Sequence, residues 1–425
     1  MDAEKGYRKR VADEQVELLL ETAGVVVIEG PKWCGKTTTA RQHAKSVLLM
    51  DNPELMEQNG RIAEIDLLLL LKGDTPRLVD EWQIAPTLWD AARYEVDQRG
   101  EFGQFIFTGS AVPADRSSIH HTGVGRFAWV RMRTMSLWES GDSVGTCSLD
   151  AMFNGVQQSA VSKNHTLENI CHLICRGGWP QSLKVSPRAA LLIARNYVDA
   201  VAKQEMSDTD GIVRSEATAR ALLRSYARHQ GTSVSVDALL ADMNAKDDFK
   251  MSDKTLREYL EALRRIFVVE DMEAWNPNLR SKTAVRTSNT RYFVDPSIAT
   301  AALGVSPGDL LKDLNTLGLF FETMAVRDLR VYADALDGNV YHYRDSTGLE
   351  CDAVMHLRNG HFALIEVKLG GGTLIEEGAK NLLKLQAKLN TQHAPSFLAV
   401  LTATGQYVYK REDSVWVIPI GALRP

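Results

Sequence analysis

One stretch decides the fold of the first part of this chain: Val25-Val-Val-Ile28-Glu-Gly30-Pro-Lys-Trp-Cys-Gly35-Lys36-Thr37-Thr-Thr39. It sets the pattern G-x-x-x-x-G-K-T between a β-branched apolar run and a helix-compatible segment, as a phosphate-binding loop requires. Glycines let successive backbone N–H groups converge on an anion, and the following helix adds its positive N-terminal end. We therefore predict a nucleotide site in which Lys36 reaches the β- and γ-phosphates and Thr37 is a ligand of Mg²⁺. The residues expected to surround the phosphates are Gly30, Pro31, Lys32, Trp33, Cys34, Gly35, Lys36, Thr37 and Thr38.

The bulk composition is that of a globular protein with several domains. The chain has 425 residues, of which 44% are hydrophobic and 24% charged, and this length predicts two to four domains. The net charge of −5 gives no global signal for nucleic acid, although a local basic face stays open. Five scattered cysteines favour a reducing cytoplasm over a disulfide framework. The N-terminus lacks a signal-peptide pattern and the longest apolar run, 67–71, is too short to cross a membrane.

A second motif follows one strand and one helix downstream of the loop. Leu78 and Val79 form a short apolar strand that ends in Asp80-Glu81. An acidic strand end at this position is the expected partner of a phosphate loop. We predict that Asp80 holds Mg²⁺ and that Glu81 is the general base for the attacking water.

Two further segments supply candidates for contact with the γ-phosphate. The strand Phe105–Ser110 ends in polar residues, and Thr108 and Ser110 either sense the phosphate or simply cap the strand. Arg126 either reaches a γ-phosphate, in the same chain or from a neighbouring subunit, or is an ordinary surface arginine. Alternating strands and helices predict a parallel sheet covered on both faces, with the ligand at the carboxyl ends of its strands.

The middle of the chain changes its pattern twice. Residues 136–214 are predicted to be mostly helical and to form a lid on the nucleotide domain, residues 1–135. Residues 215–300 predict three helices and a hairpin, which is the outline of a winged helix. The third helix carries Lys254, Arg257, Arg264 and Arg265. Two interpretations stay open, a DNA-binding helix in the major groove and a module that packs against protein.

A second charged group of residues lies in the last part, 301–425. Asp352 and Glu366-Val-Lys368 lie on consecutive predicted strands, and Glu322 lies on a preceding helix. This is the signature of a metal-dependent nuclease. Asp352 and Glu366 would hold one or two Mg²⁺ ions together with Glu322, and Lys368 would orient the attacking water.

The length of the hairpin loop decides whether this site can form. A two-residue loop pairs Asp352 with Val367 and leaves Glu366 on the other face of the sheet. A three-residue loop, 358–360, with Gly360 in a left-handed bulge sets Asp352 opposite Glu366. We predict the three-residue loop. Two alternatives to an active nuclease stay open, an exposed set of cross-strand charges and a nuclease fold kept for binding.

Taken together, these motifs resemble those of the prokaryotic AAA-type ATPases that pair an N-terminal P-loop domain with a C-terminal domain of uncharacterised function. The resemblance implies a winged helix and a small α/β restriction-endonuclease-like core after the AAA-type sheet and lid. Arg77, in place of an aliphatic residue, and the loose match at Arg126 depart from the family pattern. The matching stretches are Gly30–Thr39, Leu78–Gln83, Phe107–Ser110, Gly177–Pro180, Tyr292–Asp295, Phe321-Glu322 and Asp352…Lys368.

The sequence thus predicts a cytoplasmic, Mg²⁺-dependent ATPase whose nucleotide state controls a C-terminal half that acts on DNA. A second hypothesis is a nucleotide-controlled switch or scaffold that binds a protein partner and whose nuclease-like site is inert. A third is a DNA nuclease gated by ATP. No N-K-x-D stretch specifies guanine, so ATP is the expected nucleotide. No membrane partner is expected, and the oligomeric state stays open.

Overall fold

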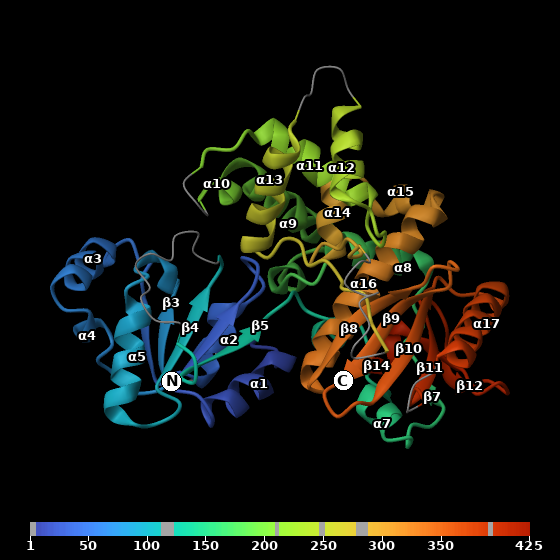
Figure 1. Cartoon of the computed structure of the whole chain (residues 1–425), viewed down its shortest axis with the longest axis horizontal. Helices are drawn as coiled ribbons and strands as arrows, with labels where there is room; N and C mark the ends of the chain where they lie inside the picture. The colour runs from blue at the N-terminus through green and yellow to red at the C-terminus, as the bar shows by residue number, and fades with distance from the viewer. Residues whose placement is uncertain (1–5, 112–122, 209–211, 246–250, 278–287, 390–393) are drawn as a thin grey trace. The chain divides into compact units, whose positions relative to one another are not determined.

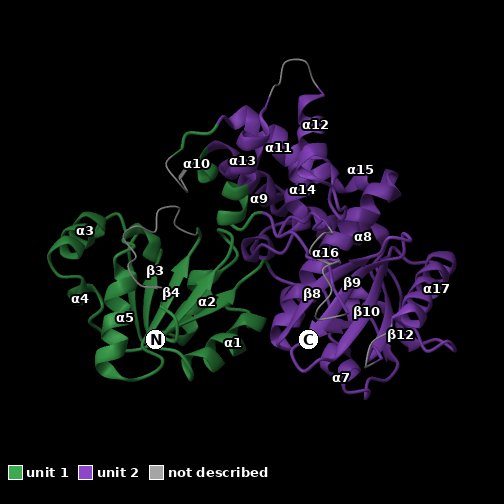
Figure 2. Cartoon of the chain, viewed as in Figure 1, with its two compact units in different colours: residues 1–134, 204–214, 261–268 green, residues 135–203, 215–260, 269–425 purple. Residues whose placement is uncertain are grey.

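Two sheets organise this chain, each in its own compact unit (Figure 2). Unit 1 comprises residues 1–134, 204–214 and 261–268, and unit 2 comprises residues 135–203, 215–260 and 269–425. The structure is a computed structural model that describes residues 6–111, 123–208, 212–245, 251–277, 288–389 and 394–425 (Figure 1). Within these ranges, no helix combines the length and the apolar character needed to cross a lipid bilayer.

The sheet of unit 1 is fully parallel and has the strand order β2-β3-β4-β1-β5. The strand that leads into the phosphate loop, β1, lies between β4 and β5, so the loop leaves the middle of the sheet edge. The predicted parallel α/β architecture is therefore confirmed. The strands are β1 Val25–Glu29, β2 Ser46–Leu49, β3 Arg77–Asp80, β4 Phe105–Gly109 and β5 Phe127–Arg131.

Both faces of this sheet are buried, because alternate residues of each strand point to opposite sides. Val25 and Val27 belong to one apolar cluster, which includes Trp89 of helix α5. Val26 and Ile28 belong to another, which includes Val16 of α1. The helical segments of this part are α1 Val11–Leu20, α2 Lys36–His43, α3 Met56–Ile65, α4 Leu67–Leu70, the 3-10 turn Trp82–Ile84 and α5 Leu88–Arg99.

Unit 2 is built on a seven-stranded mixed sheet with the order β7-β12-β13-β11-β10-β9-β8. Strands β8, β9 and β10 form an antiparallel meander, whereas β11 is parallel to β10. Helix α17 packs its buried Ala379, Leu382 and Leu385 on this sheet. Its strands are β7 Ala160–Val161, β8 Gly338–Arg344, β9 Glu350–Leu357, β10 Phe362–Lys368, β11 Phe397–Thr402, β12 Tyr407–Lys410 and β13 Trp416–Pro419. The strands β6 Cys147–Ser148 and β14 Leu423–Arg424 form a separate two-stranded sheet.

The remaining helices and helical turns of the described chain lie in the segments that follow β5 (Figure 1). They are α6 Leu137–Ser140, α7 Leu149–Phe153, α8 Leu167–Arg176, a 3-10 turn Pro180–Lys184, α9 Pro187–Ala200, a π-helix Val201–Glu205, α10 Met206–Asp208, α11 Glu216–Arg228, α12 Val236–Asn244, α13 Asp253–Arg265, α14 Pro296–Leu303, α15 Pro307–Lys312, α16 Leu314–Ala335, α17 Gly372–Lys388 and a 3-10 turn Ile420–Ala422.

The segment 136–214, the predicted helical lid, is divided between the two compact units, and its role as a lid stays a prediction. Its short strands pair with the C-terminal part of the chain, β6 with β14 and β7 with β12. Residues 135–203 consequently belong to the same compact unit as the C-terminal sheet. Helical periodicity predicts which face of a helix is buried, but it does not say which partner buries that face.

Two of the stretches that carry the family resemblance come together in the core of unit 2. The backbone N–H of Gly178 donates to Asp295 Oδ2 at 2.9 Å, and Trp179 Nε1 donates to Ser297 Oγ at 2.9 Å. Arg327 is buried and pairs with Asp295 at 3.2 Å. Since these polar groups are satisfied by one another inside the fold, the stretches 177–180 and 292–295 have a structural role here.

The three helices predicted in 215–300 are present as α11, α12 and α13. Two extended segments follow them, joined by antiparallel bridges between Val269 and Phe293 and between Met272 and Thr290. The hairpin predicted after the three helices is thus reduced to isolated bridges. This order of elements agrees with the outline of a winged helix, and the assignment itself stays a prediction.

Candidate functional site

The phosphate loop joins β1 to α2 through two glycines whose backbones only glycine adopts readily. Gly35 caps α2 with φ +105°. At Gly30, with φ +156°, an added Cβ would lie 2.0 Å from the carbonyl oxygen of Met132. The Lys36 side chain is 5% exposed, and its Nζ donates to the carbonyl oxygens of Gly30 and Pro31 at 2.9 Å each. The ammonium group therefore lies over the loop with neutral partners that a phosphate can replace.

The N-terminal segment holds this loop in place through Arg10, which our sequence analysis missed. The buried Arg10 donates from Nη1 to the Cys34 carbonyl at 2.8 Å and from Nη2 to the Arg133 carbonyl at 2.9 Å. It thus connects the loop to the segment that follows β5. A single arginine ahead of a helix carries no recognisable pattern, so the sequence offered no signal for this role.

Asp80 lies at the carboxyl end of β3 and accepts two hydroxyl hydrogen bonds on one oxygen. Thr37 Oγ1 donates to Asp80 Oδ1 at 2.8 Å, and the Thr108 hydroxyl donates to the same oxygen. Burial raises the pKa of Asp80, and the two hydroxyl groups oppose this shift. Carboxylate and hydroxyl oxygens are the hard ligands that Mg²⁺ prefers, so Thr37 and Asp80 fit the predicted metal site, with Thr108 orienting Asp80.

Glu81 adopts a left-handed backbone conformation, φ +53° and ψ +48°. Such a conformation is uncommon for residues other than glycine and clusters at functional sites. Ser110 Oγ donates to Glu81 Oε2 at 2.9 Å, and the side-chain amide of Gln83 donates to the same oxygen. The structure thus joins Ser110 to Glu81, and a contact of Ser110 with the γ-phosphate stays a prediction. Sequence reasoning missed Gln83, which a search for polar residues just after Asp80-Glu81 would have found.

The structure does not bring Arg126 to the phosphate loop of its own chain. Arg126 precedes β5, and its carbonyl accepts from the backbone N–H of Val25, the first residue of β1. Because the strands are parallel, this is the sheet edge opposite to Lys36. The Arg126 side chain pairs instead with Asp97 of α5 at 2.8 Å. The prediction that Arg126 reaches the γ-phosphate of its own chain is therefore wrong. A contribution of Arg126 to a neighbouring subunit stays a prediction.

The hairpin between β9 and β10 has the predicted register. Ile365 is paired with Ala353, and the Leu357 N–H donates to the His361 carbonyl at 2.8 Å, which leaves a three-residue loop, 358–360. Gly360 in this loop has φ +88°. Extending the register by one residue sets Asp352 opposite Glu366, on one face of the sheet.

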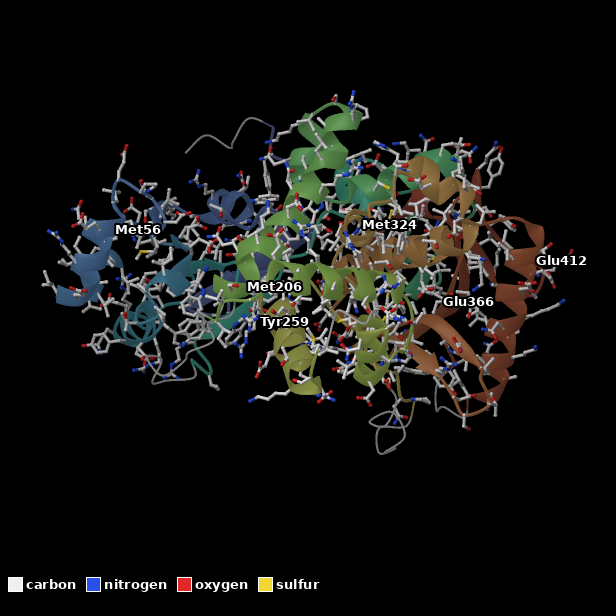
Figure 3. The ribbon with its side chains drawn as sticks, turned by 90° about the horizontal axis from the view of Figure 1, so that it is seen from above. Met56, Met206, Tyr259, Met324, Glu366 and Glu412 are labelled. Atoms are coloured by element: carbon white, nitrogen blue, oxygen red, sulfur yellow. The ribbon has the colours of Figure 1, made fainter. Side chains whose placement is uncertain are left out.

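Lys368 forms ion pairs with both of these carboxylates. Its Nζ lies 2.6 Å from Glu366 Oε2 and 3.3 Å from Asp352 Oδ2. Glu366, labelled in Figure 3, also accepts from Asn381 Nδ2 of α17 at 2.6 Å, and Asp352 accepts from the Val367 N–H at 2.8 Å. Sequence reasoning missed Asn381, which lies one helix downstream of the motif. The three predicted residues therefore come together as one group in which a single ammonium contacts two carboxylates.

Glu322 of α16 belongs to the same electrostatic neighbourhood. It accepts a hydrogen bond from the hydroxyl of Tyr292. Burial and repulsion from Asp352 raise the pKa of Glu322 well above its usual value, while Tyr292 and Lys368 oppose the shift. Burial and the charge of Asp352 also raise the pKa of Glu366, to about 7, against the opposing effect of Lys368.

These carboxylates do not form a ready-made metal site. Among the residues that the structure describes, no group of three or more His, Cys, Asp or Glu side chains is arranged to hold a metal ion. The ammonium of Lys368 occupies the position between Asp352 and Glu366. Coordination of Mg²⁺ by Glu322, Asp352 and Glu366 stays a prediction that requires Lys368 to give up at least one of its ion pairs.

The cations of α13 have acidic partners on the same helix. All four basic residues of the predicted DNA-binding helix lie within 4.0 Å of a carboxylate. The pairs are Lys254–Glu258 at 4.0 Å, Arg257–Asp253 at 2.8 Å, Arg264–Glu261 at 3.8 Å and Arg265–Glu261 at 3.6 Å. This pairing reduces the positive field that a phosphate backbone would meet.

Family models match three parts of this chain. Residues 22–140 match an AAA domain. Residues 167–309 match a domain of unknown function, DUF8612, and residues 317–423 match another, DUF4143. Two curated relatives are uncharacterized proteins of Mycobacterium bovis and Mycobacterium tuberculosis, each 24% identical over 356 residues, 82% of this chain and 71% of the relative.

Two examples of solved structures that align with part of this chain are an ATPase and a replication initiator. The Walker-type ATPase paby2304 of Pyrococcus abyssi aligns with a TM-score of 0.44 and 15% identity, over 70% of this chain and 97% of its own. The replication initiator DnaA, bound to AMPPCP and single-stranded DNA, aligns with a TM-score of 0.28 and 13% identity, over 60% and 86%. The match to the AAA domain, together with the parallel sheet and its loop, indicates that the N-terminal unit is P-loop ATPase-like, and it supports nucleotide binding.

Proposed function

We propose that this protein is a cytoplasmic, Mg²⁺-dependent ATPase whose nucleotide state controls a C-terminal half acting on DNA. The observation that carries the ATPase proposal is the hydrogen bond between Thr37 and Asp80, at 2.8 Å. It joins the end of the phosphate loop to the acidic end of β3, so both expected Mg²⁺ ligands meet beside Lys36.

Each residue of this site has a separate role in the proposed reaction. Lys36 binds the β- and γ-phosphates once its carbonyl partners are displaced. Thr37 and Asp80 would hold Mg²⁺, which neutralises phosphate charge when bound. Glu81 accepts a proton from the attacking water. Ser110 orients Glu81 by hydrogen bonding to Oε2.

The proposal for the C-terminal half combines a winged helix with a restriction-endonuclease-like core. Its support is the order of elements α16-β8-β9-β10-α17-β11 and the register that sets Asp352 opposite Glu366. Lys368 lies on the same face as Glu366, two residues further along β10. In this proposal, nucleotide binding in unit 1 changes the access of DNA to unit 2.

The decisive test is Mg²⁺-dependent ATP turnover of the full chain, with and without duplex DNA. Glu81→Gln should lower turnover by about 100-fold or more while nucleotide binding is kept, because it removes the general base. Glu57→Gln is a matched control, since Glu57 is an exposed glutamate that pairs only with Arg61 in the described structure. Stimulation by DNA that vanishes in Glu81→Gln supports the proposal, and equal turnover of both variants contradicts it.

A second candidate function is a nucleotide-controlled switch or scaffold that binds a protein partner. The observation that favours it is the charge pairing inside unit 2, where Lys368 forms ion pairs with two carboxylates. DNA binding through phosphate contacts would weaken steeply with salt, because counterions are released. ATP turnover that is indifferent to DNA, with no salt-dependent DNA binding, would favour this switch. If DNA is cleaved, cleavage that survives Asp352→Ala would exclude the Asp352 site as its source.

A further inference from the structure

The phosphate loop contains a second lysine, and this lysine has an acidic partner far along the chain. Lys32 Nζ lies 2.8 Å from Glu205 Oε1 and 2.7 Å from Glu205 Oε2. Both residues belong to unit 1, although 173 positions separate them in the sequence. The Glu205 side chain is 19% exposed and the Lys32 side chain 43%, so the carboxylate is the more buried partner and the lysine stays accessible to a ligand.

Glu205 lies at the end of a helical segment that places it beside the loop. It is the last residue of the π-helix Val201–Glu205, a rare geometry that is frequent at functional sites. The next residue, Met206 (Figure 3), is 1% exposed. The backbone N–H of Arg214 donates to Ser207 Oγ at 2.9 Å and closes the segment on itself. The backbone of this segment therefore places the Glu205 carboxylate beside Lys32.

A second distant segment contacts the same edge of the sheet. Phe267, at the end of residues 261–268, lies under the guanidinium of Arg131 with 4.3 Å between Cζ and the ring centroid. Arg131 pairs with Glu29 at 3.3 Å, and Glu29 is the residue before Gly30 of the loop. Two segments from the middle of the chain are thus attached to the strand ends that carry the phosphate loop.

We propose that Glu205 sets the nucleotide affinity of the phosphate loop by competing with phosphate for Lys32. This inference rests on the proposed nucleotide binding of unit 1 and names the residue that regulates it. With Glu205 in place, Lys32 is neutralised and a carboxylate faces the incoming polyphosphate. When nucleotide binds, Lys32 exchanges Glu205 for a phosphate oxygen, and the contact between the loop and residues 204–214 is released.

The two contacts are therefore linked reciprocally. We assume that Lys32 can bind either phosphate or Glu205, but not both at once. Detachment of residues 204–214 then raises the affinity for nucleotide by a certain factor, and bound nucleotide favours that detachment by the same factor. Lys36 does not take part in this competition, because its partners are backbone carbonyls of the loop itself. Lys32 is thus the residue through which nucleotide binding to the loop changes the contact with residues 204–214.

The test measures the affinity of the full chain for a fluorescent ATP analogue with Mg²⁺, together with KM and kcat for ATP. Glu205→Gln should tighten binding about fivefold or more, in the range of typical coupling effects, and lower KM with kcat unchanged. Lys32→Ala should weaken binding, and Lys32→Ala combined with Glu205→Gln should bind like Lys32→Ala alone. Glu216→Gln is the control, because it also removes one negative charge from an ion pair, the pair with Arg220. It should leave the affinity for nucleotide unchanged.

Each outcome separates this inference from the function on which it rests. If the wild-type chain binds the analogue and Glu205→Gln binds no tighter, the competition is disproved and nucleotide binding stands. If Glu205→Gln tightens binding equally in the Lys32→Ala background, the carboxylate acts by its field alone and the exchange at Lys32 is disproved. If the wild-type chain binds no nucleotide, the proposed function fails first. A gain in affinity is a result that a merely structural role of Glu205 would not produce.

Discussion

The phosphate loop of unit 1 and the charged hairpin of unit 2 both contain a lysine and an aspartate, but they balance charge differently. In unit 1, Lys36 is bound to backbone carbonyls and Asp80 to two threonine hydroxyls. In unit 2, Lys368 is bound directly to Asp352 and Glu366. Neutral partners hold a charge in place without cancelling it, whereas an ion pair cancels it.

This difference shows what each region is prepared to bind. A polyphosphate with Mg²⁺ can replace the carbonyl and hydroxyl partners of the first site without leaving any charge behind unpaired. A cation that enters the second site must first separate Lys368 from its carboxylates, which costs Coulombic energy in a partly buried place. The first site can therefore bind its ligand without breaking an ion pair, whereas the second site must break the ion pairs of Lys368 before it binds a cation.

The largest expected effect tests the first half of this comparison. Lys36→Ala should weaken nucleotide binding by at least about 100-fold, because two charge-assisted phosphate contacts of about 1.5 kcal/mol each are lost. The measurement is titration with a fluorescent ATP analogue. Lys45→Ala, which removes an exposed lysine shortly after α2, is the control. Unchanged affinity in Lys36→Ala would refute the assignment of the loop.

The next effect tests whether the hairpin is held together by its ion pairs. Lys368→Met should lower the free energy of unfolding by about 3 kcal/mol, because it leaves two carboxylates facing each other without a cation. Urea unfolding measures this loss, with Lys410→Met on β12 as the control for an exposed lysine. Restoration of stability by millimolar Mg²⁺ would show that the carboxylates can hold a metal. Equal stability of the two variants would mean that the ion pairs contribute nothing.

The smallest effect concerns protonation in the same hairpin. The pKa of Glu366 is raised from 4.5 to about 7 in the fold. Between these pH values the folded chain binds a proton that the unfolded chain has released, so stability falls as pH rises from about 4.5 to 7 and levels off above. The wild-type chain should therefore lose stability across this window, whereas Glu366→Gln should not.

Urea unfolding at pH 5 and pH 8 checks this slope. Glu350→Gln is the control, because Glu350 lies on the same hairpin but is half exposed and pairs with Arg344. Parallel pH profiles for the wild-type chain and Glu366→Gln would show that Glu366 is ionised throughout, and that the hairpin is a simple ion-pair group.

Local patterns in the sequence were sufficient for much of both sites. The loop at residues 30–37, the acidic end of β3 and the three-residue hairpin loop all depend on backbone conformations that nearby residues dictate. Gly360 shows this most clearly, since a left-handed residue in a short loop selects the register that sets Asp352 opposite Glu366. The parallel sheet followed in the same way from alternating strands and helices.

Tertiary structure alone decided which distant residues complete these sites. The partner of Lys32 lies 173 positions away, and Arg133, one of the partners of Arg10, lies 123 positions away from it. Neither pair has a pattern that spacing could reveal. The same holds for residues 136–214, whose helices were predicted but whose association with the C-terminal sheet was not. Sequence periodicity encodes the conformation and the buried face of each element. The choice of partner depends on how all elements pack at once, and that information exists only in the folded chain.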